Sequence, residues 1–300
     1  MMRPSFALKI NSCVNIQTIV VKDEERNNGF GPYRFIESLA DKVAYQFPDA
    51  DLIFNNLQLI YGIGNATVLK LRESGFNTLQ DLTTHPRWAK AALEVLNIID
   101  KRDINRLSCY GATDWELLGF FSPQDIKFID IETVGLYYAQ PVFLIGILIF
   151  QDGVGRIRQY LARNYEEEKA ILGELKADFR NTGIIASYNG RSFDVPYLKG
   201  RLRFHGLADQ FDAYHLDLLR HTRKNYRHNL PDCRLTTVER YLLQEERPAD
   251  LPGSEAPVYY HKYVDTGEEG YIIPILKHNA QDLLALAKLF GVLTANIQED

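Results

Sequence analysis

The stretch from Val142 to Phe150 constrains the fold more than any other, because nine residues follow one another there without a polar side chain. The run is less than half as long as a membrane-spanning helix. Gly153 and Gly155 break the chain just after it, which favours a buried β-strand. Short segments at Ile126–Glu132 and Arg156–Tyr160 flank this strand with the spacing of hairpins. We therefore expect three consecutive antiparallel strands.

The residues after these strands alternate between helix and strand signals. An amphipathic helix is expected over Tyr165–Arg180, and a fourth, short strand is expected over Ile184–Ser187. Mainly helical structure follows, interrupted by the loop Arg247–Pro257, which has turn chemistry and which we interpret as structural. This order predicts an α/β domain over residues 120–300, in which helices flank a mixed sheet.

Residues 1–115 predict a smaller, all-helical module. No strand-like alternation is visible from Leu57 to Leu107, where the apolar residues follow helical spacing. Earlier in the chain, a helix is expected around Tyr33–Tyr45. It should end before Pro48, because the residue preceding a proline is steered out of the helical conformation. A chain of 300 residues accommodates two such domains.

Composition and charge narrow the classes of protein. With 46% hydrophobic and 24% charged residues, the chain can bury a core without a metal or disulfide to hold it. The net charge of −5 counts against a protein that coats nucleic acid regardless of sequence. Cys13, Cys109 and Cys233 lack metal-ligand or redox spacing, and no stretch has the pattern of a signal peptide. We therefore expect a soluble, cytoplasmic protein with no membrane partner.

Asp130 and Glu132 form the first chemical motif. Residues two apart in a strand project from the same face, so both carboxylates would point together while Ile129 and Ile131 pack behind them. Adjacent carboxylates repel one another unless cations lie between them, and Mg²⁺ and Mn²⁺ prefer oxygen ligands. Two solvated acids on an exposed strand are the alternative that this motif alone leaves open.

Two further motifs place an aspartate on a helix. Asn189 and Gly190 predict a turn after the fourth strand, and a helix opens just beyond it. Asp194 would then lie in the first helical turn, where the helix dipole favours a negative charge. Later in the chain, His278 and Asp282 are four residues apart and share one face of a helix. Taken singly, Asp194 could be a cap and the second motif a surface pair.

In this order the three motifs resemble those of the DEDD superfamily of 3'–5' exonucleases. The agreement continues through segments that resemble the YprB-like branch of predicted exonucleases. Those segments are His215–Leu219, Cys233–Glu239 and Asp250–Gly253. The resemblance covers roughly residues 123–292. It implies a ribonuclease-H-like mixed sheet flanked by helices.

The resemblance also implies hydrolysis of phosphodiester bonds in DNA or RNA from a 3' end. Two Mg²⁺ or Mn²⁺ ions about 4 Å apart can activate water, orient the phosphate and stabilise the leaving oxygen. His278 would act as general base, although its spacing to the last aspartate is that of the tyrosine subclass. An outer, structural role for His278 is the alternative. The residues that would hold the two ions are Asp130, Glu132, Asp194 and Asp282.

Other residues would support this site. Thr133 and Asn189 would contact the nucleic acid, and Asp217 would either orient a neighbour of the ions or cap a helix. Arg220–His228 is the most basic stretch and carries an aromatic residue, so it could follow a nucleic-acid backbone or form a solvated loop. The expected partner is a single-stranded 3' end. A catalytically silent binding or scaffold protein and a structure-specific endonuclease are the rival functions.

Gly62 and Gly64 carry a second resemblance, to the helix-hairpin-helix motif, over about residues 57–84. A Gly-hydrophobic-Gly turn between helices presents backbone N–H groups to a phosphate, because glycine permits a sharp turn and a close approach. Val68 stands where a small residue is often found in the motif. Lys70 and Arg72 are the basic residues beside it, so the motif could bind either nucleic acid or protein.

Overall fold

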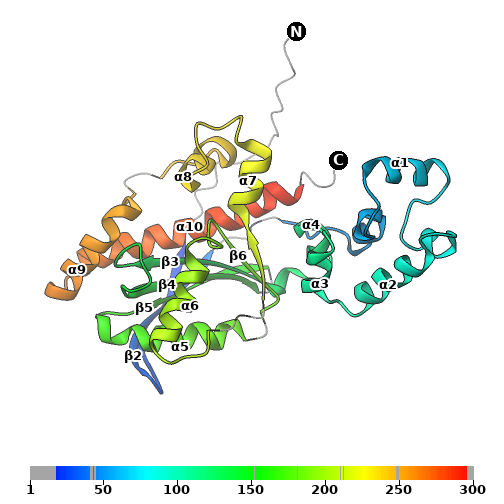
Figure 1. Cartoon of the computed structure of the whole chain (residues 1–300). Coiled ribbons are helices and arrows are strands. Elements are labelled where there is room, and N and C mark those ends of the chain that lie inside the picture. Colours follow the sequence, from blue (N-terminus) through cyan, green and yellow to red (C-terminus); the bar gives the residue numbers. More distant parts are fainter. Residues whose placement is uncertain are drawn as a thin grey trace, which may run out of the picture.

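A computed structural model describes residues 18–40, 43, 45–151, 153–180, 182–209, 211, 213–247 and 250–295. A seven-stranded mixed sheet forms the centre of this part of the molecule (Figure 1). Cys13 and the extreme ends of the two expected domains lie outside the described residues. The strands are β1 (Ile19–Asn28), β2 (Gly31–Ala40), β3 (Ile126–Thr133), β4 (Val142–Gln151), β5 (Val154–Leu161), β6 (Ile184–Ser187) and β7 (Tyr214–Asp217).

The strand order across the sheet is β1-β2-β5-β4-β3-β6-β7. β3, β4 and β5 are consecutive antiparallel strands, as the sequence predicts, and β6 pairs with β3 in parallel. β7 in turn pairs with β6 in parallel. The carboxyl ends of β3, β6 and β7 therefore lie on the same side of the sheet. The carboxyl ends of parallel strands are the usual place for a binding site in an open α/β sheet.

Helices cover both faces of the sheet (Figure 1). On one face, α10 packs against Phe128 and Leu148. On the other face, α5 and α6 pack against Ile129 and Ile145. The alternation of side chains along β3 thus supplies two separate cores. The helices of this domain are α5 (Glu168–Phe179), α6 (Asp194–Phe204), α7 (Leu218–Tyr226), α8 (Leu235–Val238), α9 (Ala256–Thr266) and α10 (Glu269–Ala295).

Residues 50–118 form a helical module with its own core. In this fully described stretch there is no strand, as the sequence predicts. The module meets the sheet through α4, because Asp114 accepts hydrogen bonds from Tyr214 of β7 and contacts His221 of α7 at 2.7 Å. Its elements are 3-10 turns at Ala50–Asn55, Leu57–Leu59 and Asp81–Thr84, and helices α1 (Asn65–Glu73), α2 (Ala89–Asp100), α3 (Ile104–Cys109) and α4 (Asp114–Leu118).

The helix expected over Tyr33–Tyr45 is wrong. Residues 31–40 form β2, which pairs with both β1 and β5 and so extends the sheet. The helical module therefore does not include residues 19–40. Charged residues conceal the strand signal, because five of the ten residues of β1 are Lys, Asp, Glu or Arg. Edge strands commonly carry such charges, which discourage pairing with other chains.

Among the described helices, none is both long enough and apolar enough to cross a membrane. The longest, α10, carries His278, Asn279 and Asp282 in its middle. Most of the buried apolar side chains of this helix belong to the core clusters of the sheet.

Candidate active site

Asp130 and Glu132 project from the face of β3 that α10 covers. Phe128, two residues before Asp130 on the same face, packs against α10. The side chain of Asn279 in α10 donates a hydrogen bond of 2.7 Å to Asp130 Oδ2. Glu132 is 8% exposed, and Asp130 is half-buried. Two fully solvated acids on an open strand face, the alternative reading of this motif, are therefore excluded.

Asn279 fixes α10 against the sheet. Its Oδ1 accepts a hydrogen bond of 2.9 Å from the Gln159 side chain of β5, while its Nδ2 donates to Asp130. Gly146 of β4 lies opposite Asp130 in the register and leaves the space for this amide. A Cβ at Gly146 would lie 2.1 Å from Asn279 Oδ1. The glycine is therefore required by packing.

Asp194 is the first residue of α6 and is 6% exposed. The turn before it contains Asn189, whose φ of 66° is left-handed, a conformation that asparagine tolerates better than most residues. At Gly190 a Cβ would lie 2.1 Å from Ser187 Oγ. The predicted turn and helix start are confirmed, and both residue types are explained by the backbone they must adopt.

Asp217 holds this turn in place from the end of β7. Its Oδ1 accepts a hydrogen bond of 2.9 Å from the backbone N–H of Asn189, and its Oδ2 accepts one of 3.1 Å from that of Arg191. Asp217 also caps α7 by accepting a hydrogen bond from Leu219 N. The capping role is thereby confirmed, and the same carboxylate also holds the turn that precedes Asp194.

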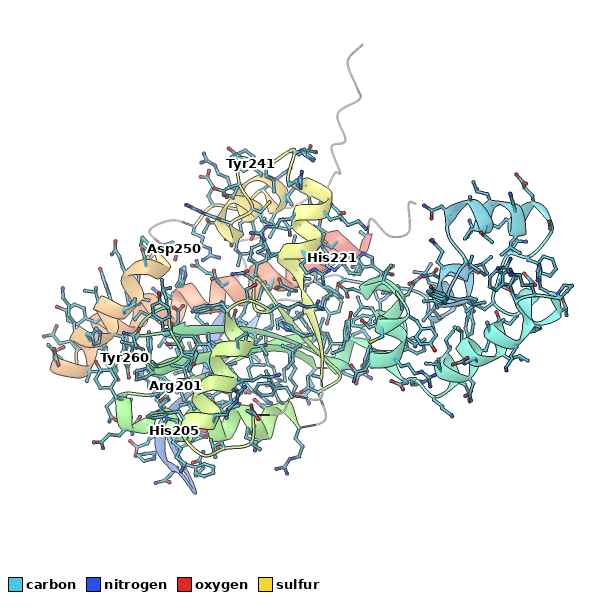
Figure 2. All side chains as sticks on the ribbon, viewed as in Figure 1. Arg201, His205, His221, Tyr241, Asp250 and Tyr260 are labelled. Atoms are coloured by element: carbon cyan, nitrogen blue, oxygen red, sulfur yellow. The ribbon has the colours of Figure 1, made fainter. Side chains whose placement is uncertain are left out.

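His278 and Asp282 lie one turn apart on the face of α10 that meets the sheet. His278 is 8% exposed, and its Nε2 is 3.7 Å from Asp282 Oδ2. Its Nδ1 is 2.9 Å from Oδ1 of Asp250, which is labelled in Figure 2 at the segment leading into α9. A carboxylate on one ring nitrogen fixes the orientation of the imidazole and assigns the other nitrogen to the site.

The carboxylates of the cluster act on one another through their charges. Burial raises the pKa of Asp130 well above its usual value, and the charges of Asp282, Glu132 and Asp194 raise it further. Burial and the charges of Asp282 and Asp194 do the same to the pKa of Glu132. Burial chiefly raises the pKa of Asp194 to about 7. Neighbouring carboxylates of this kind are stabilised in the ionised form when cations lie among them.

Arg247 reaches into this cluster, and the interpretation of its loop as purely structural is wrong. Its side chain is 8% exposed, and Nη2 lies 2.5 Å from Asp282 Oδ1 and 2.7 Å from Glu239 Oε2. Nη1 lies 3.1 Å from Asp250 Oδ2. The segment Asp250–Gly253, which carries part of the sequence resemblance, is the available signal that this loop belongs to the site.

The donor chemistry fits hard divalent cations, because carboxylate oxygens are the ligands that Mg²⁺ and Mn²⁺ prefer. As the side chains stand, no three acidic, histidine or cysteine residues within the described ranges converge closely enough to enclose one ion. Arg247 contributes to this, since its guanidinium binds Asp282 on the side of the cluster. The charge of Asp282 raises the pKa of Asp130, Glu132 and Asp194, so these four carboxylates lie near enough to interact.

Of the other residues predicted to bind nucleic acid, Thr133 adjoins the carboxylates, whereas Gly62 and Gly64 lie in the helical module. Thr133 ends β3 one residue after Glu132, and its hydroxyl donates a hydrogen bond of 2.7 Å to Gly135 O. Gly62 and Gly64 precede α1 in the helical module, which Figure 1 shows apart from the sheet. The structure therefore does not bring these two glycines to the carboxylates.

The family model of the RNase_H superfamily matches residues 127–294 of this chain. The match covers more than half of the chain and includes the stretch from Asp130 to Asp282. The chain belongs to the RNase_H superfamily. The ribonuclease-H-like fold predicted from the sequence is thereby confirmed, and membership supports a nuclease as the class of enzyme.

A curated relative and two solved structures extend the comparison. The uncharacterized protein YprB of Bacillus subtilis (strain 168) is 30% identical over 175 residues, which are 57% of this chain and 42% of that protein. The family B DNA polymerase of Pyrobaculum calidifontis is 14% identical with a TM-score of 0.48, over 91% of this chain and 45% of that one. E. coli exonuclease I in complex with a dT13 oligonucleotide is 18% identical with a TM-score of 0.34, over 53% and 45%. This chain spans less than half the length of each of these proteins.

Proposed function

We propose that the protein is a divalent-metal-dependent nuclease that removes nucleotides from the 3' end of a single-stranded nucleic acid. The observation that carries this proposal is the grouping of the buried Glu132 and Asp194 with the half-buried Asp130 and Asp282, where the charge of Asp282 raises the pKa of the other three. Such repulsion destabilises the folded protein, because burying an uncompensated charge costs free energy. The binding of two Mg²⁺ or Mn²⁺ ions would compensate it.

Asp130, Glu132, Asp194 and Asp282 would hold the two divalent ions, which would supply activation of water and stabilisation of charge on the leaving oxygen. The protein residues then position what reacts. Asp250 holds Nδ1 of His278 at 2.9 Å, which leaves Nε2 directed toward Asp282 and free to accept a proton from the attacking water. Asn279 fixes the orientation of Asp130, and Asp217 fixes the turn at Asn189. These contacts would keep the carboxylates in place during the reaction.

The test is degradation of 3'- and 5'-labelled single-stranded DNA and RNA in Mn²⁺, Mg²⁺ or EDTA. Wild type is compared with Asp130→Asn and with Glu174→Gln, a control that neutralises an acid on α5 on the opposite face of the sheet. We expect stepwise shortening that requires metal, is lost in Asp130→Asn and persists in Glu174→Gln. Activity that survives Asp130→Asn would exclude this site as its source.

The same assay decides between the rival functions. A single internal product would identify an endonuclease, and the sugar preference would follow from the DNA and RNA arms. Absence of hydrolysis with every metal, together with retained binding, would identify a catalytically silent nucleic-acid-binding protein. The cytoplasm remains the predicted place of action.

For the helical module we propose a helix-hairpin-helix-like contact with nucleic acid. Gly62 has a φ of 89°, and a Cβ at Gly64 would meet open space, so the turn exposes its backbone. Tyr61, beside it, is 99% exposed. Replacing Gly62 and Gly64 by alanine should weaken binding to long substrates while hydrolysis of short oligonucleotides continues. Unchanged binding to long substrates would leave the turn with a protein-packing role.

A further inference from the structure

The exposed face of α7 concentrates positive charge in a chain whose net charge is −5. Its basic residues follow the spacing i, i+3, i+4 and i+7, so they form one stripe along the helix. All four are exposed, while Leu218, Leu219 and Thr222 on the other side are buried. We call this stripe the basic face. It consists of Arg220, Arg223, Lys224 and Arg227.

The basic face lacks compensating charges. Within the described ranges, none of its four residues forms an ion pair with a carboxylate. Like charges three and four residues apart on a helix destabilise it. Arg234 adds a further exposed cation from the loop opposite, where it is 3.9 Å from Asp232. The helix therefore carries a repulsion that an anionic ligand would relieve.

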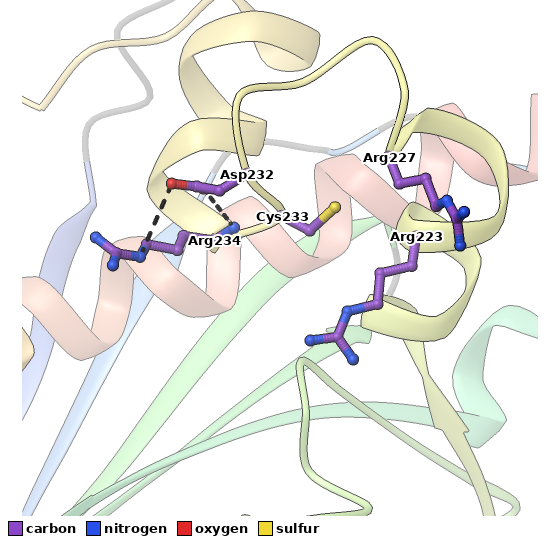
Figure 3. A pocket seen from close by; sticks show the side chains of 5 residues that line it. All are labelled: Arg223, Arg227, Asp232, Cys233 and Arg234. Carbon is purple, nitrogen blue, oxygen red and sulfur yellow. Dashed lines mark hydrogen bonds and ion pairs between the residues drawn. The ribbon is translucent and has the colours of Figure 1, made fainter.

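A cavity of about 500 Å³ lies between this helix and the following loop (Figure 3). It is lined by Arg223, Arg227, Asp232, Cys233 and Arg234. Three arginines thus line one cavity, and guanidinium is the group best suited to bidentate recognition of phosphate.

Both walls of the cavity are attached to the proposed active site. α7 begins directly after Asp217, whose carboxylate holds the backbone of Asn189 and Arg191. The opposite loop is held by Tyr188, whose hydroxyl donates a hydrogen bond of 2.7 Å to Cys233 O. Along the helix, Arg227 lies about 15 Å from Asp217, at 1.5 Å for each of ten residues. The basic face therefore leads away from the carboxyl end of β7, where Asp217 lies.

We propose that the basic face and its cavity bind the sugar-phosphate backbone of the nucleic-acid strand several nucleotides before the end that is hydrolysed. This inference rests on the proposed nuclease function and adds a binding subsite to it. Phosphates, spaced regularly along the strand, complement a regular stripe of cations.

The test compares wild type with the double variant Arg223→Gln/Arg227→Gln. The matched control is Lys169→Gln/Lys262→Gln, which removes the same charge from α5 and α9. Binding of a fluorescent oligothymidine of about twenty nucleotides is measured in EDTA across a range of KCl concentrations. The slope of log K against log[salt] is negative, and each lost phosphate contact makes it less steep by about 0.7 for a single strand. The slope of the double variant should therefore be less steep by about 1.4. The control should keep the wild-type slope.

Steady-state hydrolysis supplies the second measurement. With the long oligonucleotide, we expect KM to rise about tenfold or more in the double variant while kcat stays within about twofold. With a substrate too short to reach α7, both constants should match wild type. Thermal unfolding should show no loss of stability, since removing like charges from α7 relieves repulsion.

The outcomes separate this inference from the function on which it rests. If wild type hydrolyses the oligonucleotide and the double variant keeps both the salt slope and KM, the basic face is not a backbone subsite and the nuclease proposal stands. If the double variant loses affinity for anionic vesicles or an acidic peptide but not for the oligonucleotide, the inference is also overturned. If wild type neither binds nor hydrolyses any nucleic acid, both proposals fall.

Discussion

The guanidinium of Arg247 lies 2.5 Å from the carboxylate of Asp282, at the place where the proposed metal site needs that carboxylate free. Arg247 also lies 2.7 Å from Glu239 and 3.1 Å from Asp250. Neighbouring acids raise its own pKa further above the usual value, against the effect of burial. In the metal-free protein, this side chain compensates negative charge that divalent ions would otherwise compensate.

Arg247→Gln should therefore destabilise the metal-free protein and strengthen its binding of Mn²⁺. Removing one partner of a buried ion pair costs roughly 3–5 kcal/mol, because the other charge is left uncompensated. Thermal unfolding in EDTA should show a lower Tm. Titration of Mn²⁺, followed by electron paramagnetic resonance, should show an affinity about tenfold higher or more, since one competitor for Asp282 is gone.

The control for this variant is Arg240→Gln, which removes an exposed arginine that pairs with Glu246 at 3.3 Å. Exposed pairs contribute little to stability, so Arg240→Gln should leave both Tm and the affinity for Mn²⁺ unchanged. Equal affinity for Mn²⁺ in wild type and Arg247→Gln would show that the arginine does not compete for the carboxylate.

Gly146→Ala should destabilise the protein by roughly 1–3 kcal/mol, the usual cost of forcing a methyl group into a packed core. The new Cβ would lie 2.1 Å from Asn279 Oδ1 and would displace the amide that binds Asp130. Urea unfolding measures the loss. Gly270→Ala, at a position of α10 where a Cβ meets open space, should be neutral or slightly stabilising. A neutral Gly146→Ala would contradict the packing requirement.

The stability of the metal-free protein should fall as pH rises from about 4 to about 7, in part because of Asp194. Burial raises the pKa of Asp194 to about 7 in the folded state, from 3.8. Between these values the unfolded state releases the proton and the folded state keeps it, so the free energy of unfolding decreases with pH. Above pH 7 this contribution is fully lost.

Asp194→Asn cannot ionise and should lack this part of the slope. Unfolding of wild type and variant in EDTA at several pH values between 4 and 8 measures the difference. The variant should gain stability relative to wild type as the pH rises through this range. Parallel stability curves would show that Asp194 titrates in the folded protein as it does in the unfolded chain.

Arg201→Met should cost about 3–5 kcal/mol of stability, because it would strand the buried charge of Glu168. The two side chains are 3% and 1% exposed, and Arg201 Nε donates a hydrogen bond of 2.7 Å to Glu168 Oε1. Figure 2 labels Arg201 on α6, together with His205, which also contacts Glu168. Chemical unfolding measures the effect. Arg203→Met, an exposed neighbour on α6, should change stability little.

The central strands could be predicted because their sequences are apolar beyond what a surface segment tolerates. Val142–Phe150 is buried at nearly every residue, and the hairpin order of β3, β4 and β5 follows from the turns between them. β2 could not be predicted in the same way. Its residues from Phe35 to Ser38 are buried in succession between two strands, so they lack the alternation of a one-sided strand, and its charged partner β1 gives no apolar signal.

The acids of the candidate site could be proposed from spacing, because a strand and a helix each repeat with a fixed period. Asp130, Glu132 and Asp282 follow those periods, and Asp194 follows from a helix start. Arg247 could not be proposed, since it comes from a loop with no period, and its partner Glu239 begins a short π-helix. Their contact depends on how the chain returns to the sheet, which local sequence does not encode.

The accommodation of Asn279 by Gly146 has a consequence for how related sequences should vary. A methyl group at position 146 is tolerable only where position 279 is small, and a side chain as long as asparagine at 279 is tolerable only over glycine. Changes at these two positions should therefore occur in pairs during divergence. A lineage that keeps one without the other must also have moved its last helix along the sheet, and with it the aspartate at position 282.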